Sequence, residues 1–301
     1  MPQIIRKAFT LIELLVVIAI IGILSSLIVV SMSGVTQKAN IAKAQVFSNS
    51  LRNALMLNIV GEWKIDEISG TSANDSWGGN SNGTLYGFAN TTAGYGDANN
   101  SGWKSSSNCI SGSCLKFDGS DDYVDCGIGA GLDLTDAVTI GLWVNPSTLT
   151  STRTIFFRGI ASAASGSYAI NQEANKINGY IFDTAWRATS ASTTSLVLNQ
   201  WYYVVLTYDK TNLKLYINGV NEKTSPLTTS INIAVGSTTR IGDANGVQRF
   251  NGSVDEIRIF NAALSSAQIQ ENYYIGLNSL LASGQINERE YGEKINSIAK
   301  Q

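Results

Sequence analysis

The sequence predicts a long N-terminal α-helix, then an all-β antiparallel sandwich, then a short helical C-terminal tail. Three observations support this order. An apolar run fills residues 9–30, short alternating runs separated by Gly, Ser, Thr and Asn begin near residue 61, and a helical apolar period returns after residue 263. We therefore expect the helix over 9–60, the sandwich over 62–275 and the tail over 276–301.

The composition excludes several classes of function. The 301 residues carry a net charge of -2 and include no histidine. A chain without a basic surplus has no field to hold nucleic acid non-specifically, so we expect no nucleic-acid partner. The lack of histidine also removes the commonest general base and transition-metal ligand, which excludes catalysis by histidine.

The first half of the N-terminal helix is long enough to cross a membrane. Positions 9–30 are apolar apart from Thr10, Glu13, Ser25 and Ser26. Because an α-helix rises about 1.5 Å per residue, about 20 residues span the hydrocarbon core. A secretory signal peptide has a shorter apolar region, of about 7 to 15 residues. We therefore expect a single membrane-spanning helix.

The second half of this helix is predicted to be amphipathic. After Gly34, small and apolar residues recur at three- and four-residue steps between polar ones. Their positions are Val35, Ala39, Ala42, Val46, Leu51, Ala54 and Leu55. One helix of about 50 residues would extend about 75 Å, with an apolar stripe that needs a covering surface.

The carboxylate of Glu13 lies inside the apolar run. A charge in lipid costs about 2.5 to 3.5 kcal/mol on insertion scales, so it normally has a partner. Arg6 and Lys7 lie about two turns away, at the end that prefers the headgroups, so we expect the partner on another chain. Cleavage after Ala8 would supply it as the new α-amino group of Phe9 in a neighbouring subunit.

The run KAFTLIELLVV over residues 7–17 resembles the N-terminal signature of type IV pilins and the related pseudopilins. It has a short basic leader over 1–8, a small residue at the cut, an aromatic first mature residue and a glutamate four residues later. The resemblance implies cleavage between Ala8 and Phe9 by a prepilin peptidase, methylation of the new amine, and assembly of fibres through Glu13. Family members usually have Gly where this chain has Ala8.

The cysteines indicate a local disulfide. Cys109 and Cys114 bracket the short loop ISGS, a spacing that suits an oxidising extracellular setting. Cys126 is left over, and no neighbouring Lys or Arg would lower its pKa. We expect Cys126 to be a small buried apolar residue.

The middle of the chain reads as strands. Alternate residues of VTIGLWV (138–144) are apolar, WYYVVL (201–206) is apolar on both faces, and LKLYI (213–217) leads into the turn Asn218-Gly219. No helical period interrupts the strands before about residue 265, which favours a sandwich.

Several phrases in this region together resemble a laminin G-like domain of the concanavalin A-like lectin superfamily. They are LKFDGSDDYV (115–124), TIGLWV (139–144), NQWYYVVLTY (199–208), LYING (215–219), RIG (240–242) and FNGSVDEIRIF (250–260). The resemblance implies a jelly-roll sandwich over roughly 62–275. This fold hosts lectins, glycosidases and adhesive modules, so the fold does not settle the function.

Catalysis is not expected. Glycoside hydrolysis needs two carboxylates about 5 to 9 Å apart, which hydrolases of this fold place as alternating acidic residues on one strand. The acidic pairs Asp121-Asp122 and Asp255-Glu256 are adjacent in sequence, so their side chains leave a strand on opposite faces.

The resemblance implies two kinds of binding residue. For calcium, the ligands would be Asp75, Asn80 and Asp255, with Glu256 as a weaker candidate. The alternative is that Asp75 and Asn80 form turns and that Asp255 is hydrogen-bonded to backbone. For surface glycans, the available rings are Trp143, Tyr168, Tyr180 and Trp186, although aromatic residues of sandwiches are often core.

The C-terminal segment is predicted to be helical. A short helix begins after Ser265 or Ser266 and closes the sandwich module near residue 275. Beyond it, one or two short helices split at Gly284 carry an apolar set that we expect to dock on the domain or on a neighbouring subunit. That set is Leu277, Leu280, Leu281, Ile286, Tyr291, Ile295 and Ile298.

Three functions are consistent with these features. The first is a structural subunit of a type IV pilus-like surface fibre that displays the laminin G-like domain for adhesion. The second is a low-copy minor or tip pilin that acts as a carbohydrate-binding adhesin. The third is a pseudopilin of a secretion or DNA-uptake system. In each case the protein spans the membrane once before assembly with other pilin subunits, and the large outer domain favours an extracellular fibre used for display.

Overall fold

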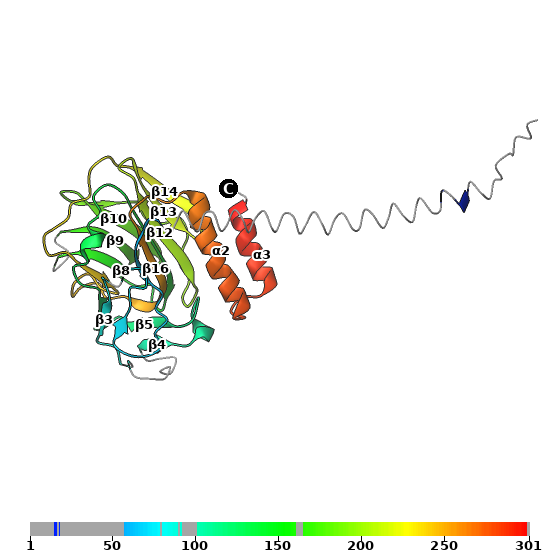
Figure 1. Ribbon diagram of the computed structural model, residues 1–301, viewed down its shortest axis with the longest axis horizontal. Coiled ribbons are helices and arrows are strands. Elements are labelled where there is room, and N and C mark those ends of the chain that lie inside the picture. Colours follow the sequence, from blue (N-terminus) through cyan, green and yellow to red (C-terminus); the bar gives the residue numbers. More distant parts are fainter. Residues whose placement is uncertain are drawn as a thin grey trace, which may run out of the picture. The chain divides into compact units, whose positions relative to one another are not determined.

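The computed structural model describes residues 57–299 apart from 79, 90, 92–100 and 161–164, together with residues 15, 16 and 18. The chain divides into the units Met1–Ala54 and Leu55–Gln301, and the second is described below (Figure 1). Of the predicted N-terminal helix, Leu15, Val16 and Ile18 are described and are helical. The predicted end of this helix at residue 60 was wrong, because Leu57 and Asn58 form a turn and strand β1 (Ile59–Trp63) begins at Ile59, which pairs with Phe260. The predictions for Ala8, Phe9 and Glu13 lie outside the described residues. No helix in the described part of the chain has the length and apolarity needed to cross a membrane.

Two antiparallel sheets form the sandwich predicted from the sequence. Sheet A has the strand order β14-β13-β12-β7-β16-β5-β4, and β1 pairs with the second half of β16. Its strands are β1 (Ile59–Trp63), β4 (Gly102–Lys104), β5 (Cys114–Asp118), β7 (Val138–Pro146), β12 (Tyr202–Tyr208), β13 (Asn212–Ile217), β14 (Val220–Pro226) and β16 (Asn251–Phe260).

Sheet B has the order β11-β10-β9-β8-β15-β6-β3-β2. Its strands are β2 (Ser72–Ala73), β3 (Gly83–Tyr86), β6 (Tyr123–Asp125), β8 (Thr152–Gly159), β9 (Gly166–Glu173), β10 (Lys176–Phe182), β11 (Trp186–Ala188) and β15 (Thr238–Ile241). Two short 3-10 turns, η1 (Ser106–Asn108) and η2 (Ala130–Leu132), lie in the connections. The predicted turn Asn218-Gly219 joins β13 to β14, and both of its residues have positive φ.

The main core fills the space between the sheets. On β12, Tyr202, Val204 and Leu206 point into it, because side chains alternate along a strand. Their partners across the strands, such as Val144 and Leu215, belong to the same core. One apolar face of β12 is therefore buried against sheet B.

A second core lies on the outer face of sheet A, under two C-terminal helices. The alternate residues of the same run, Trp201, Tyr203 and Val205, pack there with helix α2 (Ser266–Ala282) and with helix α3 (Glu288–Ala299). Figure 1 shows both helices against sheet A. The predicted docking of the tail is thus confirmed, and it explains why β12 is apolar on both faces.

Helix α2 begins as predicted but does not end at residue 275. Ser265 and Gln268 form a capping box at its start, and the helix continues to Ala282. The predicted boundary between 275 and 276 was wrong because Gly276 is a packing position: an added Cβ there would lie 2.2 Å from Cζ2 of Trp143. Gly284 has a φ of +72° and separates α2 from α3, as predicted.

We expect Gly276→Ala to destabilise the protein and Gly292→Ala to stabilise it. The Trp143 ring packs against both Tyr203 and Tyr273, at 5.3 and 5.5 Å between centroids, and these two rings are 6.3 Å from each other, so Trp143 has little room to move away from a methyl group. We expect a loss of about 1 to 3 kcal/mol for Gly276→Ala. Gly292 lies inside α3 with nothing within 4 Å of an added Cβ, so alanine should add up to about 1 kcal/mol. Thermal unfolding of the full chain measures both, and equal midpoints would contradict this packing.

Candidate functional site

A polar row crosses the outer face of sheet A. Lys116 on β5 lies opposite Ser253 on β16, and Ser253 lies opposite Asn145 on β7. Their chain neighbours point the other way, as Val144 and Val254 do into the core between the sheets. Polar residues at these outward positions indicate a stretch of sheet A that no apolar element covers.

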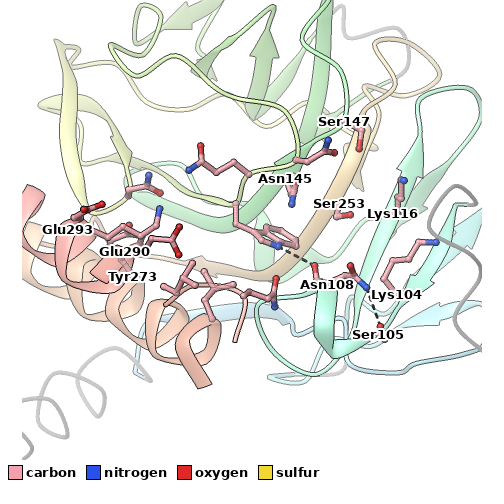
Figure 2. Close-up of a pocket in the computed structure, with 18 of the residues that line it drawn as sticks. Lys104, Ser105, Asn108, Lys116, Asn145, Ser147, Ser253, Tyr273, Glu290 and Glu293 are labelled. Atoms are coloured by element: carbon pink, nitrogen blue, oxygen red, sulfur yellow. Dashed lines mark hydrogen bonds between the residues drawn. The ribbon is translucent and has the colours of Figure 1, made fainter. Parts of the chain in front are cut away.

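Helix α2 covers the adjacent row and leaves this one open. In that row, Trp143 on β7 and Asp255 on β16 are cross-strand partners, and both are buried. Gly276 of α2 lies on the Trp143 ring. Beyond the helix, a cleft of about 930 Å³ opens between sheet A and the two helices (Figure 2).

Neutral hydrogen-bonding groups line most of the cleft. Asn145 and Ser253 belong to the sheet, and the others come from loops and helices around it. The amide and hydroxyl side chains are Ser105, Asn108, Asn145, Ser147, Asn199, Gln200, Asn218, Ser253, Gln285 and Ser297. Amides and hydroxyls can both donate and accept hydrogen bonds, so this lining suits a ligand with many hydroxyl groups.

Charged side chains lie on two sides of the cleft. In Figure 2, Lys104 and Lys116 come from the strand side, and Glu290 and Glu293 come from the helical side. Glu290 accepts a hydrogen bond from the backbone N–H of Asn287 at 3.0 Å, next to the start of α3. Glu293 pairs with an arginine one turn earlier on its own helix. Both carboxylates therefore already have a role in stabilising α3.

Two side chains tie the loop after β4 to the rest of the cleft. Trp201 donates from Nε1 to the carbonyl oxygen of Asn108 at 3.2 Å. Gln285, between the two helices, donates from Nε2 to the carbonyl oxygens of Cys109 at 2.5 Å and Ser106 at 3.3 Å. The loop is thus hydrogen-bonded to both sheet A and the helical side.

A disulfide closes the same loop. Cys109 and Cys114 are joined, with their Cα atoms 5.5 Å apart, as the sequence predicts. Cys126 is a buried free thiol, also as predicted, and burial raises its pKa well above the usual range. The pair therefore constrains the wall of the cleft, while the third cysteine belongs to the core.

The side chain of Asp255, on strand β16, is hydrogen-bonded to the backbone of this disulfide loop. Its Oδ2 accepts hydrogen bonds from the backbone N–H groups of Ile110 at 2.7 Å and Ser111 at 3.2 Å, and its Oδ1 accepts one from Glu256 at 2.9 Å. Burial and the nearby Glu256 raise the pKa of the Asp255 carboxyl well above its usual range. Asp255 therefore has the role that the sequence analysis gave as the alternative to calcium binding: its side chain is hydrogen-bonded to backbone N–H groups.

Three of the four predicted calcium ligands, Asp75, Asp255 and Glu256, already have partners within the fold. Asp75 is buried in a turn, where its Oδ1 accepts from the N–H groups of Glu62 at 3.1 Å and Trp77 at 3.2 Å, and Asn80 is exposed. Among the described residues, the groups of acidic or thiol side chains close enough to share one ion do not include Asp75. Glu256 is bonded to an arginine on its own strand. The ligand set and calcium binding itself both stay predictions.

Another carboxylate group was missed by the sequence analysis. Asp118, Asp121 and Asp122 lie within reach of one another in the loop between β5 and β6. Asp122 is buried and accepts hydrogen bonds from the backbone N–H of Asp118 at 2.7 Å and from the Ser101 hydroxyl at 3.2 Å. Burial and the neighbouring carboxylates raise its pKa to about 7. The phrase DGSDD was the available signal, but it is equally typical of an exposed turn.

The prediction of glycan binding was wrong for two of the four aromatic rings. Trp143 is 2% exposed beneath α2, and Tyr168 is fully buried between the sheets, so neither can stack on a sugar. Tyr180 and Trp186 lie on the outer face of sheet B, half-buried, with ring centroids 6.3 Å apart. Glycan binding by these two rings stays a prediction.

The comparisons with known proteins match two separate segments of the chain, and each agrees with a resemblance found in the sequence. Residues 118–270, about half of the chain, match the concanavalin A-like lectin/glucanases superfamily. Residues 5–29 match the prokaryotic N-terminal methylation motif. The protein is therefore of a class that has an N-terminal methylation motif of the type IV pilin kind, followed by a concanavalin A-like sandwich. The chain belongs to the concanavalin A-like lectin/glucanases superfamily. No curated protein matches it.

Several solved structures have a similar fold. Domain 4 of AbnA, an extracellular GH43 arabinanase from Geobacillus stearothermophilus solved in complex with arabinotriose, matches at a TM-score of 0.55 and 20% identity, covering 71% of this chain and 97% of that one. The botulinum neurotoxin serotype G binding domain matches at 0.53 and 16% identity, covering 73% and 51%. This chain thus spans about half of that binding domain. Such low identities establish the fold alone.

We expect the stability of the protein to fall as the pH rises from about 4 to about 7, in part through Asp122. Its pKa is raised from 3.8 to about 7 in the folded protein, so folding retains a proton that the unfolded chain releases. The stabilisation is complete below the unfolded pKa and is lost as the pH rises through the folded one.

The variant Asp122→Asn isolates this effect. An amide keeps both contacts of Asp122, because the Ser101 hydroxyl can accept as well as donate. The melting temperature of the variant should fall less between these pH values than that of the parent protein. Asp136→Asn, at an exposed surface ion pair, is the control and should follow the parent. Parallel pH profiles for all three proteins would contradict the assignment.

Proposed function

We propose that this protein is a subunit of a type IV pilus-like surface fibre whose concanavalin A-like module binds carbohydrate in the cleft of sheet A. The N-terminal segment would anchor the precursor in the membrane and then build the fibre core. The module would remain outside the cell as the adhesive part. The observation that carries the binding proposal is the cleft itself, a concave surface lined by neutral amide and hydroxyl side chains.

The assembly half of the proposal rests on the methylation motif. The motif covers residues 5–29 and so includes the residues predicted for processing, Ala8 and Phe9, and the acid of the apolar run, Glu13. A prepilin peptidase would cut between Ala8 and Phe9 and release an amine. In the fibre, that amine would neutralise the Glu13 carboxylate of the adjoining subunit, which removes the cost of a lone charge in an apolar core.

The binding half rests on the chemistry of the lining. Sugar hydroxyls both donate and accept, and the amides of Asn145 and Gln200 can answer them in either direction. A cleft of about 930 Å³ has room for several sugar rings, since ligand pockets commonly measure about 300 to 1,000 Å³. Domain 4 of AbnA, which shares this fold, was solved in complex with arabinotriose. These points favour an oligosaccharide as the ligand.

We also propose that the module binds without chemical turnover. A glycosidase needs an acid and a second carboxylate that face the scissile bond. The two glutamates of the cleft are engaged in stabilising α3, and Asp255 is bonded to backbone N–H groups beneath the loop. Incubation of the protein with arabinotriose or with any oligosaccharide that it binds should leave the sugar intact by mass spectrometry.

We expect Glu13→Ala to insert into the membrane but to be absent from fibres. The substitution removes the acid that would meet the amine of the next subunit, while it makes the apolar run easier to insert. Cell fractionation followed by shearing of surface fibres measures both properties. Thr10→Ala, which removes a polar group without a charge from the same run, is the control and should assemble. A normal fibre yield from Glu13→Ala would contradict the assembly role.

We expect Asn145→Ala to weaken carbohydrate binding by the full chain. The loss of one neutral hydrogen bond should reduce affinity by about three- to tenfold. Binding is measured on an array of neutral oligosaccharides that includes arabinotriose, with detergent-solubilised protein. Asn221→Ala, which removes an exposed amide on the edge strand β14, is the control and should bind like the parent.

The array also separates the alternatives for the module. Failure of the parent protein to bind any neutral saccharide would contradict the cleft proposal and leave the assembly proposal intact. Quantitative mass spectrometry of sheared fibres then distinguishes a major subunit, present at about the copy number of the fibre, from a low-copy tip adhesin. Absence from the fibres would favour the pseudopilin alternative.

A further inference from the structure

The outer face of sheet B carries a group of aromatic and basic side chains, on the other sheet from the cleft. Tyr86 on β3 and Tyr123 on β6 are cross-strand partners. Their rings are stacked, with centroids 4.9 Å apart and 14° between the planes. Tyr86 is 46% exposed, so part of this large ring meets solvent. We call Tyr86, Tyr123, Arg240 and Arg249 the tyrosine-arginine platform.

Two guanidinium groups lie over the ring of Tyr123. The Cζ atom of Arg240 is 4.4 Å from the centroid of Tyr123, and that of Arg249 is 5.7 Å from it. Both distances are within the range of about 6 Å for an attraction between a cation and an aromatic face. Arg240 also pairs with Asp125 at 3.1 Å and with Asp243 at 3.4 Å, so its charge is compensated within the fold.

Arg249 has no such compensation. None of the ion pairs and side-chain hydrogen bonds among the described residues involves its guanidinium, and its Nη1 is shielded from water without a partner. The backbone beside it is held in place, because its carbonyl oxygen accepts a hydrogen bond from Arg153 Nη1 at 2.6 Å. A half-buried guanidinium with unused donors is an unfavourable arrangement for the protein alone.

The guanidinium groups around Arg249 are not all compensated by carboxylates. Arg153 donates to the Arg249 backbone and Arg240 lies over the same Tyr123 ring, and within the described part of the chain only Arg240 of these three arginines is ion-paired. The Nε atoms of Arg153 and Arg240 are likewise buried without a hydrogen-bond partner. An anionic group placed beside Arg249 would therefore gain charge-assisted hydrogen bonds without displacing an existing ion pair.

We propose that the tyrosine-arginine platform is a second binding site, which takes a saccharide carrying a carboxylate. The planar fork of a guanidinium matches a carboxylate and can bind it through two hydrogen bonds. The exposed ring of Tyr86 offers an apolar face against which a sugar ring can pack. Together these groups select an acidic sugar, such as a uronate or a sialate, over a neutral one.

Other ligands fit the platform less well. A neutral sugar could pack on Tyr86 but would leave the Arg249 donors unmatched. Single-stranded nucleic acid also binds aromatic and arginine side chains, but it requires a positively charged groove that follows its backbone. This chain has a net charge of -2 and a pI of about 5.3, which opposes a long polyanion. A short acidic saccharide needs only the unpaired guanidinium of Arg249.

The test measures binding of the full chain in detergent to tetragalacturonate and to sialyllactose by isothermal titration calorimetry. Methyl-esterified tetragalacturonate and lactose are the neutral counterparts, because they keep the shape and lose the charge. The salt concentration is about 0.15 M, at which the Debye length is about 8 Å and distant charges contribute little. A short single-stranded oligonucleotide is measured in parallel.

We expect the parent protein to bind at least one acidic probe and to bind its neutral counterpart far more weakly. Arg249→Gln should weaken binding of the acidic probe by about tenfold, the loss expected for a charge-assisted hydrogen bond. Tyr86→Ala should weaken it by about threefold to tenfold through the lost ring contact. Thermal unfolding of both variants checks that the fold is retained.

Matched controls exclude general effects of charge and of exposed rings. Arg289→Gln removes an exposed cation from α3, and Trp77→Ala removes another exposed aromatic side chain, so both should change affinity by less than about twofold. Failure to bind both acidic probes, equal binding of acidic and neutral forms, unchanged affinity in Arg249→Gln and Tyr86→Ala, or tighter binding of the oligonucleotide would each overturn the proposal.

This site is independent of the cleft proposal. Asn145→Ala changes the cleft on sheet A and should leave affinity for the acidic probe unchanged. Loss of acidic-probe binding in that variant would mean that the acidic saccharide enters the cleft, which would overturn the assignment to sheet B. The two proposals can therefore fail separately.

Discussion

The packing of α2 on sheet A determines what the rest of the module can do. The helix backbone approaches the Trp143 ring at Gly276, and the ring packs against both Tyr203 and Tyr273. Sheet A is therefore buried on both faces beneath the helix, and β12 can be apolar along its whole length. Where the cover ends, outward residues such as Asn145 become polar, so the edge of the helix is also the edge of the cleft.

The buried carboxylate of Asp255 adds a second constraint. A carboxyl group removed from water needs hydrogen-bond partners, and two of the three N–H groups that Asp255 accepts from belong to the disulfide loop. The same loop accepts hydrogen bonds from Trp201 and Gln285. One wall of the cleft is therefore fixed from the sheet, from the helices and by a covalent bond. Such a wall favours a preformed site, in which little ordering is needed when a ligand binds.

The sequence was sufficient for the sandwich but not for its binding surfaces. Alternation along β7 and β12, and the double-sided run of β12, predicted two packed faces, which the structure confirms. The cleft was missed because Asn145 and Ser253 look like any exposed strand residues until a helix from far along the chain borders them. Trp143 was misassigned for the same reason, since only the packing of α2 shows that its face of the sheet is covered.

Display on a fibre changes what either surface must achieve. A subunit in many copies presents its binding sites as a multivalent array, and linked sites can raise the overall affinity about 10² to 10⁴ times without any new contact. A cleft lined mainly by amide and hydroxyl side chains, which binds a single oligosaccharide weakly, is then sufficient for adhesion. The platform on sheet B uses a different interaction, because a carboxylate on Arg249 adds charge-assisted hydrogen bonds that weaken with salt. Adhesion through the two faces would therefore differ in its dependence on ionic strength, which makes their contributions separable in the intact fibre.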